Sequence, residues 1–291
     1  MRYEGPIYRP PSESESLLIQ ATTGCPWNRC TFCMVYKNGP RYRERPVDEI
    51  FADLHEARDR CGTPPHTLFL PAGNTIAMRT DHLAAVCREA RRVFPALSRI
   101  TVYGSSQYIH RKGPDGLALL AEAGLSRIHV GLESGDDRVL AAVCKGTCAA
   151  EQIAAGRWVR EAGIELSLYV VLGLAGVEGS QAHARLTAEA INRIGPEYVR
   201  LRTFVPKMDT PMLNAVLNGD FTMLGPHGVI RETLELIRRL SIRTRITSDH
   251  YTNYVNVAGC LPEDKDRMIQ VLTGALAREE RTFRPFFIGH E

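Results

Sequence analysis

Six apolar runs rich in β-branched or aromatic residues recur along the chain, separated by segments of helical periodicity. Short runs of this composition are typical of buried strands. The strands predicted from them are Leu17–Thr22, Thr67–Pro71, Arg99–Gly104, Arg127–Leu132, Ile164–Leu172 and Tyr198–Phe204. The pattern therefore predicts a chain in which strand and helix alternate.

The segments between these strands place apolar residues three and four positions apart, so that they share one face of a helix. The helix expected after Pro46 buries Val47, Ile50, Phe51, Leu54 and Ala57. In the next helix Thr80 is suited to the N-cap, and the apolar stripe runs from Leu83 to Phe94. Alternating buried strands and amphipathic helices predict a parallel sheet covered by helices.

The predicted fold class is α/β, an open partial (β/α)6 TIM-like barrel, because a closed barrel of eight units needs two more strands. We expect an N-terminal arm over residues 1–15, the barrel over 16–205, and a C-terminal α-rich extension over 206–291 that covers the barrel mouth. The extension is predicted to hold helices near Pro226–Leu240 and Pro262–Glu280 and a short strand near Arg245–His250.

Composition narrows the class of protein. With 44% hydrophobic and 24% charged residues, the chain of 291 residues is globular rather than disordered. Its longest apolar stretch, residues 166–177, is too short for the roughly 20 residues that cross a bilayer. Because the N-terminal residues lack the apolar segment of a secretory signal, we expect a cytoplasmic protein. The net charge of +3 neither requires nor excludes a nucleic-acid partner.

Three of the eight cysteines, Cys25, Cys30 and Cys33, crowd together directly after the first predicted strand. Such cysteines in a cytosolic chain indicate metal binding rather than disulfides. The carboxyl ends of parallel strands are where α/β folds place their sites. Three thiolates suit iron–sulfur or zinc and leave one metal position open for a substrate or cofactor.

Three other interpretations of these cysteines stay open. A ferredoxin-like site would take Cys61 as a distant fourth ligand, but a helix of about 15 residues carries that thiol roughly 22 Å away. A structural zinc site would pair Cys30 and Cys33 with Cys144 and Cys148, and leave Cys25 unused. Inert buried cysteines are the third alternative.

The cysteine motif C-x4-C-x2-C, with Phe32 before its last cysteine, resembles that of the radical S-adenosylmethionine superfamily over residues 16 to about 205. The superfamily motif normally has three residues between the first two cysteines. The branch resembled is that of stand-alone coproporphyrinogen-oxidase-like and tRNA-modifying enzymes. The resemblance implies a 4Fe-4S cluster on the three cysteines, with one iron open to S-adenosyl-L-methionine. One electron then cleaves a sulfur–carbon bond, and a 5′-deoxyadenosyl radical abstracts hydrogen from the substrate.

The same resemblance assigns cofactor contacts to loops after the first, second, fourth and fifth strands. It places Phe32 against the adenine, Gly73 and Asn74 at the methionine amino group, Glu133 at the ribose hydroxyls, Lys145 at the methionine carboxylate, and Gly173 and Gly176 beside the adenine. Alternatives remain at each loop. Residues 71–74 also fit an ordinary turn, Glu133 an ion pair with an arginine or a helix cap, and Lys145 a solvated side chain.

Polar segments near the same rim are candidates for the substrate pocket. They are Tyr36, Arg43, Gln107, Tyr108, Asp249, His250, Asn253 and Tyr254. With no cobalamin module or RNA-binding appendage visible, we expect a small-molecule substrate and a flavodoxin- or ferredoxin-type reductant. Cys144, Cys148 and Cys260 offer ligands for a second cluster. The competing class is a non-catalytic electron-transfer or zinc-structured protein.

Overall fold

The computed structural model describes residues 1–290, which divide into two compact units. The first unit consists of Met1–Asn28, Val35–Val130 and Trp158–Leu166, and the second consists of Arg29–Met34, Gly131–Arg157 and the chain from Ser167 onward. No helix in residues 1–290 has the length and apolar character needed to cross a bilayer. The predicted borders after residues 15 and 205 differ from this division and stay predictions.

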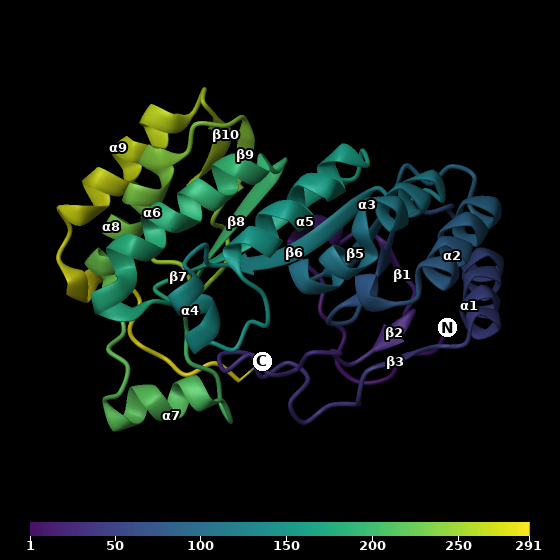
Figure 1. Ribbon diagram of the computed structural model, residues 1–291, viewed down its shortest axis with the longest axis horizontal. Coiled ribbons are helices and arrows are strands. Elements are labelled where there is room, and N and C mark those ends of the chain that lie inside the picture. The colour runs from purple at the N-terminus through teal and green to yellow at the C-terminus, as the bar shows by residue number, and fades with distance from the viewer. Residues whose placement is uncertain (291) are drawn as a thin grey trace. The chain divides into compact units, whose positions relative to one another are not determined.

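Parallel strands form the centre of the first unit (Figure 1). Their order is β1 (Leu17–Leu18), β4 (Thr67–Leu70), β5 (Arg99–Gly104) and β6 (Arg127–Glu133), and β6 runs on into the second unit. The connecting helices are α1 (Val47–Arg60), α2 (Thr80–Val93) and α3 (Ser106–Glu122), with short 3-10 turns at Pro11–Glu13 and Thr75–Ala77. A separate antiparallel pair is formed by β2 (Thr22–Thr23) and β3 (Arg43–Glu44).

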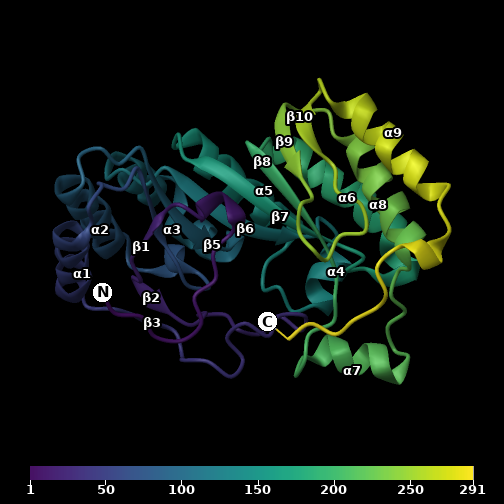
Figure 2. The same ribbon diagram turned by 180° about the vertical axis from the view of Figure 1, so that it is seen from behind.

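The second unit repeats the parallel arrangement. Strands β7 (Glu165–Leu172), β8 (Tyr198–Thr203) and β9 (Thr244–Thr247) are parallel, and β10 (Ala258–Leu261) joins β9 antiparallel. Its helices are α4 (Asp137–Ala142), α5 (Ala149–Glu161, whose end lies in the first unit), α6 (Gly176–Ile194), α7 (Pro211–Asn218), α8 (Pro226–Arg239) and α9 (Lys265–Leu276), before a 3-10 turn at Glu280–Thr282. Helices α6, α8 and α9 lie side by side over one face of these strands (Figures 1 and 2).

The predicted α/β class with mainly parallel strands is confirmed, but the first predicted strand, Leu17–Thr22, is wrong as a single element. Two backbone carbonyls between β1 and β2 accept hydrogen bonds from Arg45. The amide of Arg45 donates to the Ala21 carbonyl at 2.9 Å, and its guanidinium donates to the Gln20 carbonyl at 2.7 Å. These carbonyls are thereby satisfied outside the β1–β4 ladder.

One local prediction also needs correction, and two elements were not predicted. Thr80 is the first residue of α2 rather than its N-cap, and its hydroxyl instead accepts a hydrogen bond from Lys112 at 3.1 Å. Helix α7 was not among the predicted elements. Its start is set by Thr210, whose hydroxyl accepts from the Leu213 amide, and by Pro211 at the first helical position. Strand β10 was missed because Ala-Gly-Cys-Leu has little β propensity.

Candidate cofactor and substrate site

The loop between β2 and β3 carries the three cysteines, and their side chains are partly exposed. Asn28 adopts a left-handed conformation with φ of 44°, and its side chain donates to the Tyr36 carbonyl at 2.9 Å. Asparagine tolerates this conformation, which helps the longer four-residue spacer to turn. Cys25 belongs to the first unit, whereas Cys30 and Cys33 belong to the second.

Within residues 1–290 no three histidine, cysteine, aspartate or glutamate side chains gather closely enough to hold a metal ion. Whether an iron–sulfur cluster fits this loop therefore depends on the chemistry of its donor atoms. Three accessible thiols are the soft donors that iron–sulfur clusters take. The amide of Cys33 donates to the Cys30 carbonyl at 3.4 Å, a turn that keeps these two on one short loop. The donor set fits an iron–sulfur cluster.

In the first unit, Gly73 lies against the cysteine loop. A Cβ atom at Gly73 would lie 2.5 Å from Cε2 of Tyr36 and 3.0 Å from Cβ of Cys25. Only glycine permits this approach, because real Cβ contacts are not so short. Tyr36 is buried. Its predicted substrate role stays a prediction, and its observed contact is with Gly73.

Asn74 links the loop after β4 to Ser105, the residue that follows β5. Its side-chain amide donates to the Ser105 hydroxyl at 2.8 Å, and its side-chain oxygen accepts from the Ser105 amide at 3.1 Å. The side chain is also almost completely buried. These bonds fix the loop that carries Gly73, and the predicted contact of Asn74 with the cofactor stays a prediction.

Two tyrosines lie near Cys25. Burial raises the pKa of Tyr42, and the nearby Glu44, Tyr108 and Cys25 raise it further. Burial also raises the pKa of Tyr108, against the opposing effect of Arg111. Tyr108 was predicted, but Tyr42 was missed. Its buried hydroxyl has no hydrogen-bond partner within residues 1–290.

The other two substrate residues predicted in the first unit are Gln107 and Arg43. Gln107 is buried in the first turn of α3. Arg43 is exposed and forms an ion pair with Glu4. No contact of either side chain with Cys25 is observed in the described residues, so their assignment to substrate stays a prediction.

In the second unit, the predicted cofactor residues Glu133 and Lys145 meet. Lys145 Nζ lies 2.9 Å from Glu133 Oε1, and the lysine is 8% exposed. Burial alone would lower the pKa of Lys145, but the Glu133 carboxylate and the thiolates of Cys30 and Cys33 outweigh it, and the pKa is raised. Glu133 therefore pairs with a lysine instead of an arginine, and Lys145 is not a solvated side chain.

This pair depends on local backbone features that were not singled out from the sequence. Glu133 holds a left-handed conformation, with φ of 62°, at the end of β6. Such strain in a residue other than glycine clusters at functional sites. A Cβ atom at Gly131 would lie 2.0 Å from Glu133 Oε1 and 3.0 Å from Lys145 Nζ. Gly131 thus makes room for the ion pair.

The second half of the cysteine loop is anchored in the same unit. The Thr31 amide donates to the Val143 carbonyl at 3.0 Å, and the Met212 amide donates to the Thr31 carbonyl at 3.1 Å. Phe32 packs against a small hydrophobic cluster, which consists of Val139, Val143, Leu174, Phe204 and Met212. Leu174 lies between the two predicted adenine glycines, so Phe32 and that loop share one apolar cluster.

The loop that contains Gly173 and Gly176 is held by a residue that the sequence analysis missed. The Gly173 amide donates to Oε1 of Glu232 on α8 at 2.6 Å. Ser180 donates to the other carboxyl oxygen, and His183 Nε2 lies 3.6 Å from Oε1. A signal was present, because Glu232 lies three and four positions from Val229 and Leu236 on the buried face of its helix.

Burial sets the charge of this network. It raises the pKa of Glu232 to about 7, against the hydrogen bonds from Ser180 and Gly173. It lowers the pKa of His183 to about 4, against the charge of Asp136. Between these values both side chains are neutral. Glu232 therefore fixes the loop by hydrogen bonds to a mostly uncharged carboxyl group near pH 6.

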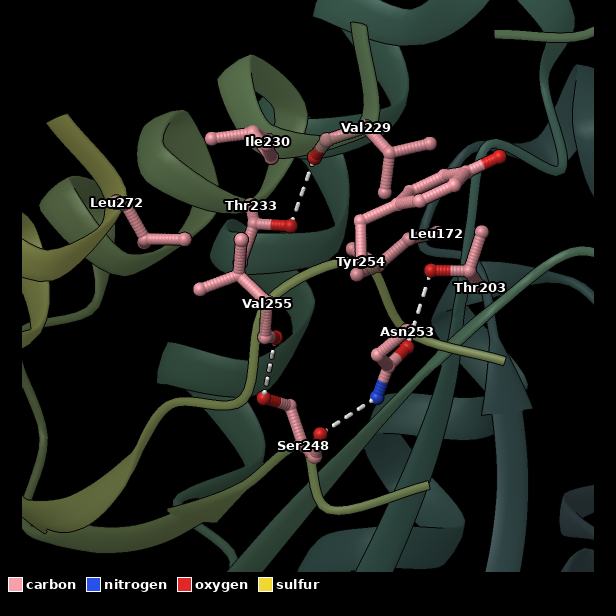
Figure 3. Close-up of a pocket in the computed structure, with 10 residues that line it drawn as sticks. All are labelled: Leu172, Thr203, Val229, Ile230, Thr233, Ser248, Asn253, Tyr254, Val255 and Leu272. Carbon is pink, nitrogen blue, oxygen red and sulfur yellow. Dashed lines mark hydrogen bonds between the residues drawn. The ribbon is translucent and has the colours of Figure 1, made fainter. Parts of the chain in front are cut away.

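Two of the predicted C-terminal substrate residues, Asn253 and Tyr254, line a small cavity (Figure 3). The Asn253 amide donates to the carbonyls of Leu201 and Ser248 at 2.9 Å each, and its oxygen accepts from Thr203 at 3.0 Å. Tyr254 also lines the cavity, which has room for about one water molecule. The Asn253 side chain thereby stabilises the loop, and the role of both residues toward a substrate stays a prediction.

The other two substrate residues predicted in this loop are His250 and Asp249. His250 shares a hydrogen bond of 2.7 Å with Thr252, and Asp249 is exposed. Among the other cysteines, Cys61 caps α1 and is exposed, Cys144 is exposed, and Cys148 and Cys260 are partly buried. The second cluster that the sequence left open on Cys144, Cys148 and Cys260 has no gathered ligand set in residues 1–290.

The fold and the residues described in each unit define an α/β protein whose loop between β2 and β3 carries three thiols. A model of the Radical SAM superfamily matches residues 19–185, more than half of the chain. The chain belongs to the radical S-adenosylmethionine superfamily. Its cofactors are those of the superfamily, a 4Fe-4S cluster and S-adenosylmethionine. The membership favours catalysis over the electron-transfer and zinc alternatives.

Individual relatives agree with this assignment. The chain is 28% identical over 203 residues to a tRNA-2-methylthio-N(6)-dimethylallyladenosine synthase from Sorangium cellulosum, over 58% of this chain and 39% of that protein. The chain thus spans about two fifths of the length of this curated relative.

Two solved structures share the partial-barrel fold. Coproporphyrinogen III oxidase from Escherichia coli, a radical SAM enzyme, has a TM-score of 0.57 and 16% identity over 77% of this chain and 52% of its own. The radical S-adenosylmethionine methyltransferase TsrM from Kitasatospora setae, solved with cobalamin and a [4Fe-4S] cluster, has a TM-score of 0.54 and 20% identity over 68% of this chain and 38% of its own. At these identities the likeness shows the fold alone.

Proposed function

We propose that this chain is a radical S-adenosylmethionine enzyme that starts radical chemistry on a small-molecule substrate. The buried Lys145–Glu133 pair beside the Cys30 and Cys33 thiols carries the proposal. A buried lysine is costly unless it is paired. This one places a cation and a carboxylate beside the metal-ligand loop, where a zwitterionic cofactor needs partners for its own carboxylate and hydroxyl groups.

Each residue then has a defined task. Cys25, Cys30 and Cys33 hold three irons of the cluster, Lys145 binds the methionine carboxylate, Glu133 accepts from the ribose hydroxyls, and Gly73, Gly173, Gly176 and Phe32 border the remainder of the cofactor. When bound, the cluster and S-adenosylmethionine would supply one-electron reductive cleavage of the sulfonium and the abstraction of a hydrogen atom from the substrate. The protein orients the substrate and excludes water, which protects the radical.

Superfamily members need a reductant and a substrate, and we propose a flavodoxin- or ferredoxin-type donor for this chain. The proposed location is the cytoplasm. In the proposed domain arrangement, residues 1–15 form an arm, residues 16–205 bind the cofactors, and residues 206–291 cover the site. No substrate is carried over from the curated relative, since the chain spans less than half of that protein.

Anaerobic reconstitution tests the function. Wild type is expected to bind about four irons per chain, and dithionite is expected to release 5′-deoxyadenosine from S-adenosylmethionine, measured by liquid chromatography and mass spectrometry. A Cys25/Cys30/Cys33 triple-alanine variant should lose both. The matched control is Cys61→Ala, because Cys61 is an exposed thiol at the end of α1. A colourless zinc protein, a two-iron spectrum, or cluster loss in Cys61→Ala would refute the proposal.

A further inference from the structure

One face of the sheet in the second unit carries arginines. Side chains alternate along β8, so Val199 and Leu201 are buried, whereas Arg200 and Arg202 project from the opposite face and are partly exposed. Strand register places Tyr169 of β7 and Thr247 of β9 beside Arg200. We call this the arginine face; it consists of Ser167, Tyr169, Arg200, Arg202, Arg245 and Thr247.

Arg202 is held in place without an acidic partner. Its Cζ atom lies 4.7 Å from the centre of the Tyr169 ring. Stacking of this kind fixes the guanidinium plane and leaves its N–H edge available. The Nε atom is buried and has no hydrogen-bond partner, and no carboxylate within residues 1–290 forms an ion pair with this side chain. A guanidinium with a buried, unsatisfied donor carries an energetic cost that a bound anion would remove.

Its two arginine neighbours differ. Arg200 donates from Nε to the Ser167 hydroxyl at 3.0 Å and likewise forms no ion pair in the part of the chain that the structure describes. Arg245 is exposed, and its charge is felt by Asp264. Two adjacent guanidinium groups on one strand, Arg200 and Arg202, therefore lack a carboxylate.

Arg202 also lies toward the cofactor-binding end of its unit. It is the residue before Thr203, the last residue of β8, and carboxyl ends of parallel strands are where α/β sites form. Its registered neighbour is Val171, which packs against the same hydrophobic cluster as Phe32. The arginine face thus reaches the apolar cluster that borders the proposed adenine site.

We infer that Arg202, assisted by Arg200, binds an oxyanion of the substrate, which is a small molecule with a carboxylate or phosphate group. The inference rests on the proposed function, and it adds the substrate class. The planar fork of arginine matches both groups in a bidentate manner. A nucleic-acid backbone fits less well, because phosphate contacts of that kind come from exposed basic surfaces, whereas Arg202 is partly buried on a strand.

Ligand-observed NMR with two probes tests this inference on the anaerobically reconstituted protein. Sodium succinate is the carboxylate probe and inorganic phosphate the phosphate probe, each titrated at constant ionic strength. Wild type is expected to bind at least one of them saturably, in the millimolar range. Arg202→Gln should weaken that binding about tenfold, which equals the loss of one charge-assisted hydrogen bond. Arg202→Lys should also weaken binding, because it keeps the charge and loses the fork.

The matched control is Arg185→Gln on α6, which removes an exposed arginine outside the arginine face and is expected to bind like wild type. Circular dichroism checks that each variant folds. Arg200→Gln should weaken binding less than Arg202→Gln, since Arg200 already bonds to Ser167. The inference is overturned if wild type binds neither probe, if Arg202→Gln and Arg202→Lys both bind like wild type, or if only a single-stranded RNA oligonucleotide binds through Arg202.

The two proposals fail separately. A wild type that cleaves S-adenosylmethionine but binds neither probe refutes the substrate class alone. A wild type that binds a probe through Arg202 but does not cleave S-adenosylmethionine refutes the radical chemistry alone.

Discussion

Each unit contains a lysine that is largely withdrawn from solvent, and the two are treated differently. In the first unit, Lys112 donates to two neutral oxygens, the Met78 carbonyl at 2.6 Å and the Thr80 hydroxyl at 3.1 Å, and burial lowers its pKa to about 8. In the second unit, Lys145 pairs with Glu133, and its pKa is raised.

The difference between the two pKa values shows which lysine keeps its charge. Lys112 can lose its proton at moderate cost, so it serves as a hydrogen-bond donor that links the Thr75–Ala77 turn and α2 to α3. Lys145 stays charged beside Cys30 and Cys33, as a residue that binds an anionic group must. The buried charge of Lys145 and the guanidinium of Arg202, which forms no ion pair within residues 1–290, are therefore better suited to bind an anion than Lys112 of the first unit.

The largest predicted effect on the unfolding free energy is that of replacing Lys145. Lys145→Met leaves the Glu133 carboxylate buried without its cation, which typically costs about 3 to 5 kcal/mol. Lys112→Met removes two hydrogen bonds but strands no carboxylate, so we expect a loss of about 1 to 2 kcal/mol. Urea unfolding of both variants measures the difference. Equal losses would contradict the comparison, and Lys145→Met/Glu133→Leu should recover much of the loss.

The second prediction concerns the pH dependence of Glu232. Its folded-state pKa of about 7 lies above the ordinary 4.5, so the folded protein binds this proton more tightly and loses stability as pH rises through that window. Wild type should lose about 2 to 3 kcal/mol relative to Glu232→Gln between pH 5 and pH 8. His183 has a lowered pKa and acts in the opposite sense below pH 6.5, but it is present in both proteins.

Urea unfolding at the two pH values gives this difference. Glu235→Gln on the same helix is the control, because Glu235 is a partly exposed partner of Arg239 and should track wild type. A wild type and Glu232→Gln with parallel stability profiles would show that the Glu232 carboxyl is not the group that titrates.

The sequence singled out Glu133 and Lys145 through a resemblance to a family motif, and their assignment to the cofactor stays a prediction. It also located five of the six barrel strands to within a residue or two. It did not reveal that Glu133 and Lys145 bond to each other, since that contact depends on a left-handed residue and on the space at Gly131.

Other features escaped because they depend on contacts distant in sequence. Glu232 lies more than fifty residues from Gly173, and the bond between them is set by the docking of α8. Arg202 looked like an ordinary strand residue, and only its stacking on the Tyr169 ring and the lack of a carboxylate partner within residues 1–290 distinguish it. The split of the first strand likewise follows from Arg45, a residue that lies beyond the cysteine loop.

The third prediction concerns side-chain packing at Gly73 in the first unit. Gly73→Ala would push a methyl group into the Tyr36 ring, and overpacking of this kind costs about 1 to 3 kcal/mol. Gly62→Ala is the control, because a Cβ there meets nothing within 4 Å, and it should be neutral or slightly stabilising. Tyr36→Leu is expected to relieve part of the Gly73→Ala penalty, as measured by thermal unfolding. An additive double variant would show that the ring is not the obstacle.

The smallest predicted effect is at Arg43, the first-unit arginine expected at the substrate. Its ion pair with Glu4 is exposed on both sides, so Arg43→Ala should change the unfolding free energy by less than about 0.5 kcal/mol. High salt should leave the variant and wild type equally stable, because screening already removes most of such a pair. Succinate and phosphate binding should also be unchanged. A loss of probe binding as large as that of Arg202→Gln would return Arg43 to the substrate site and show that oxyanion recognition is shared by both units.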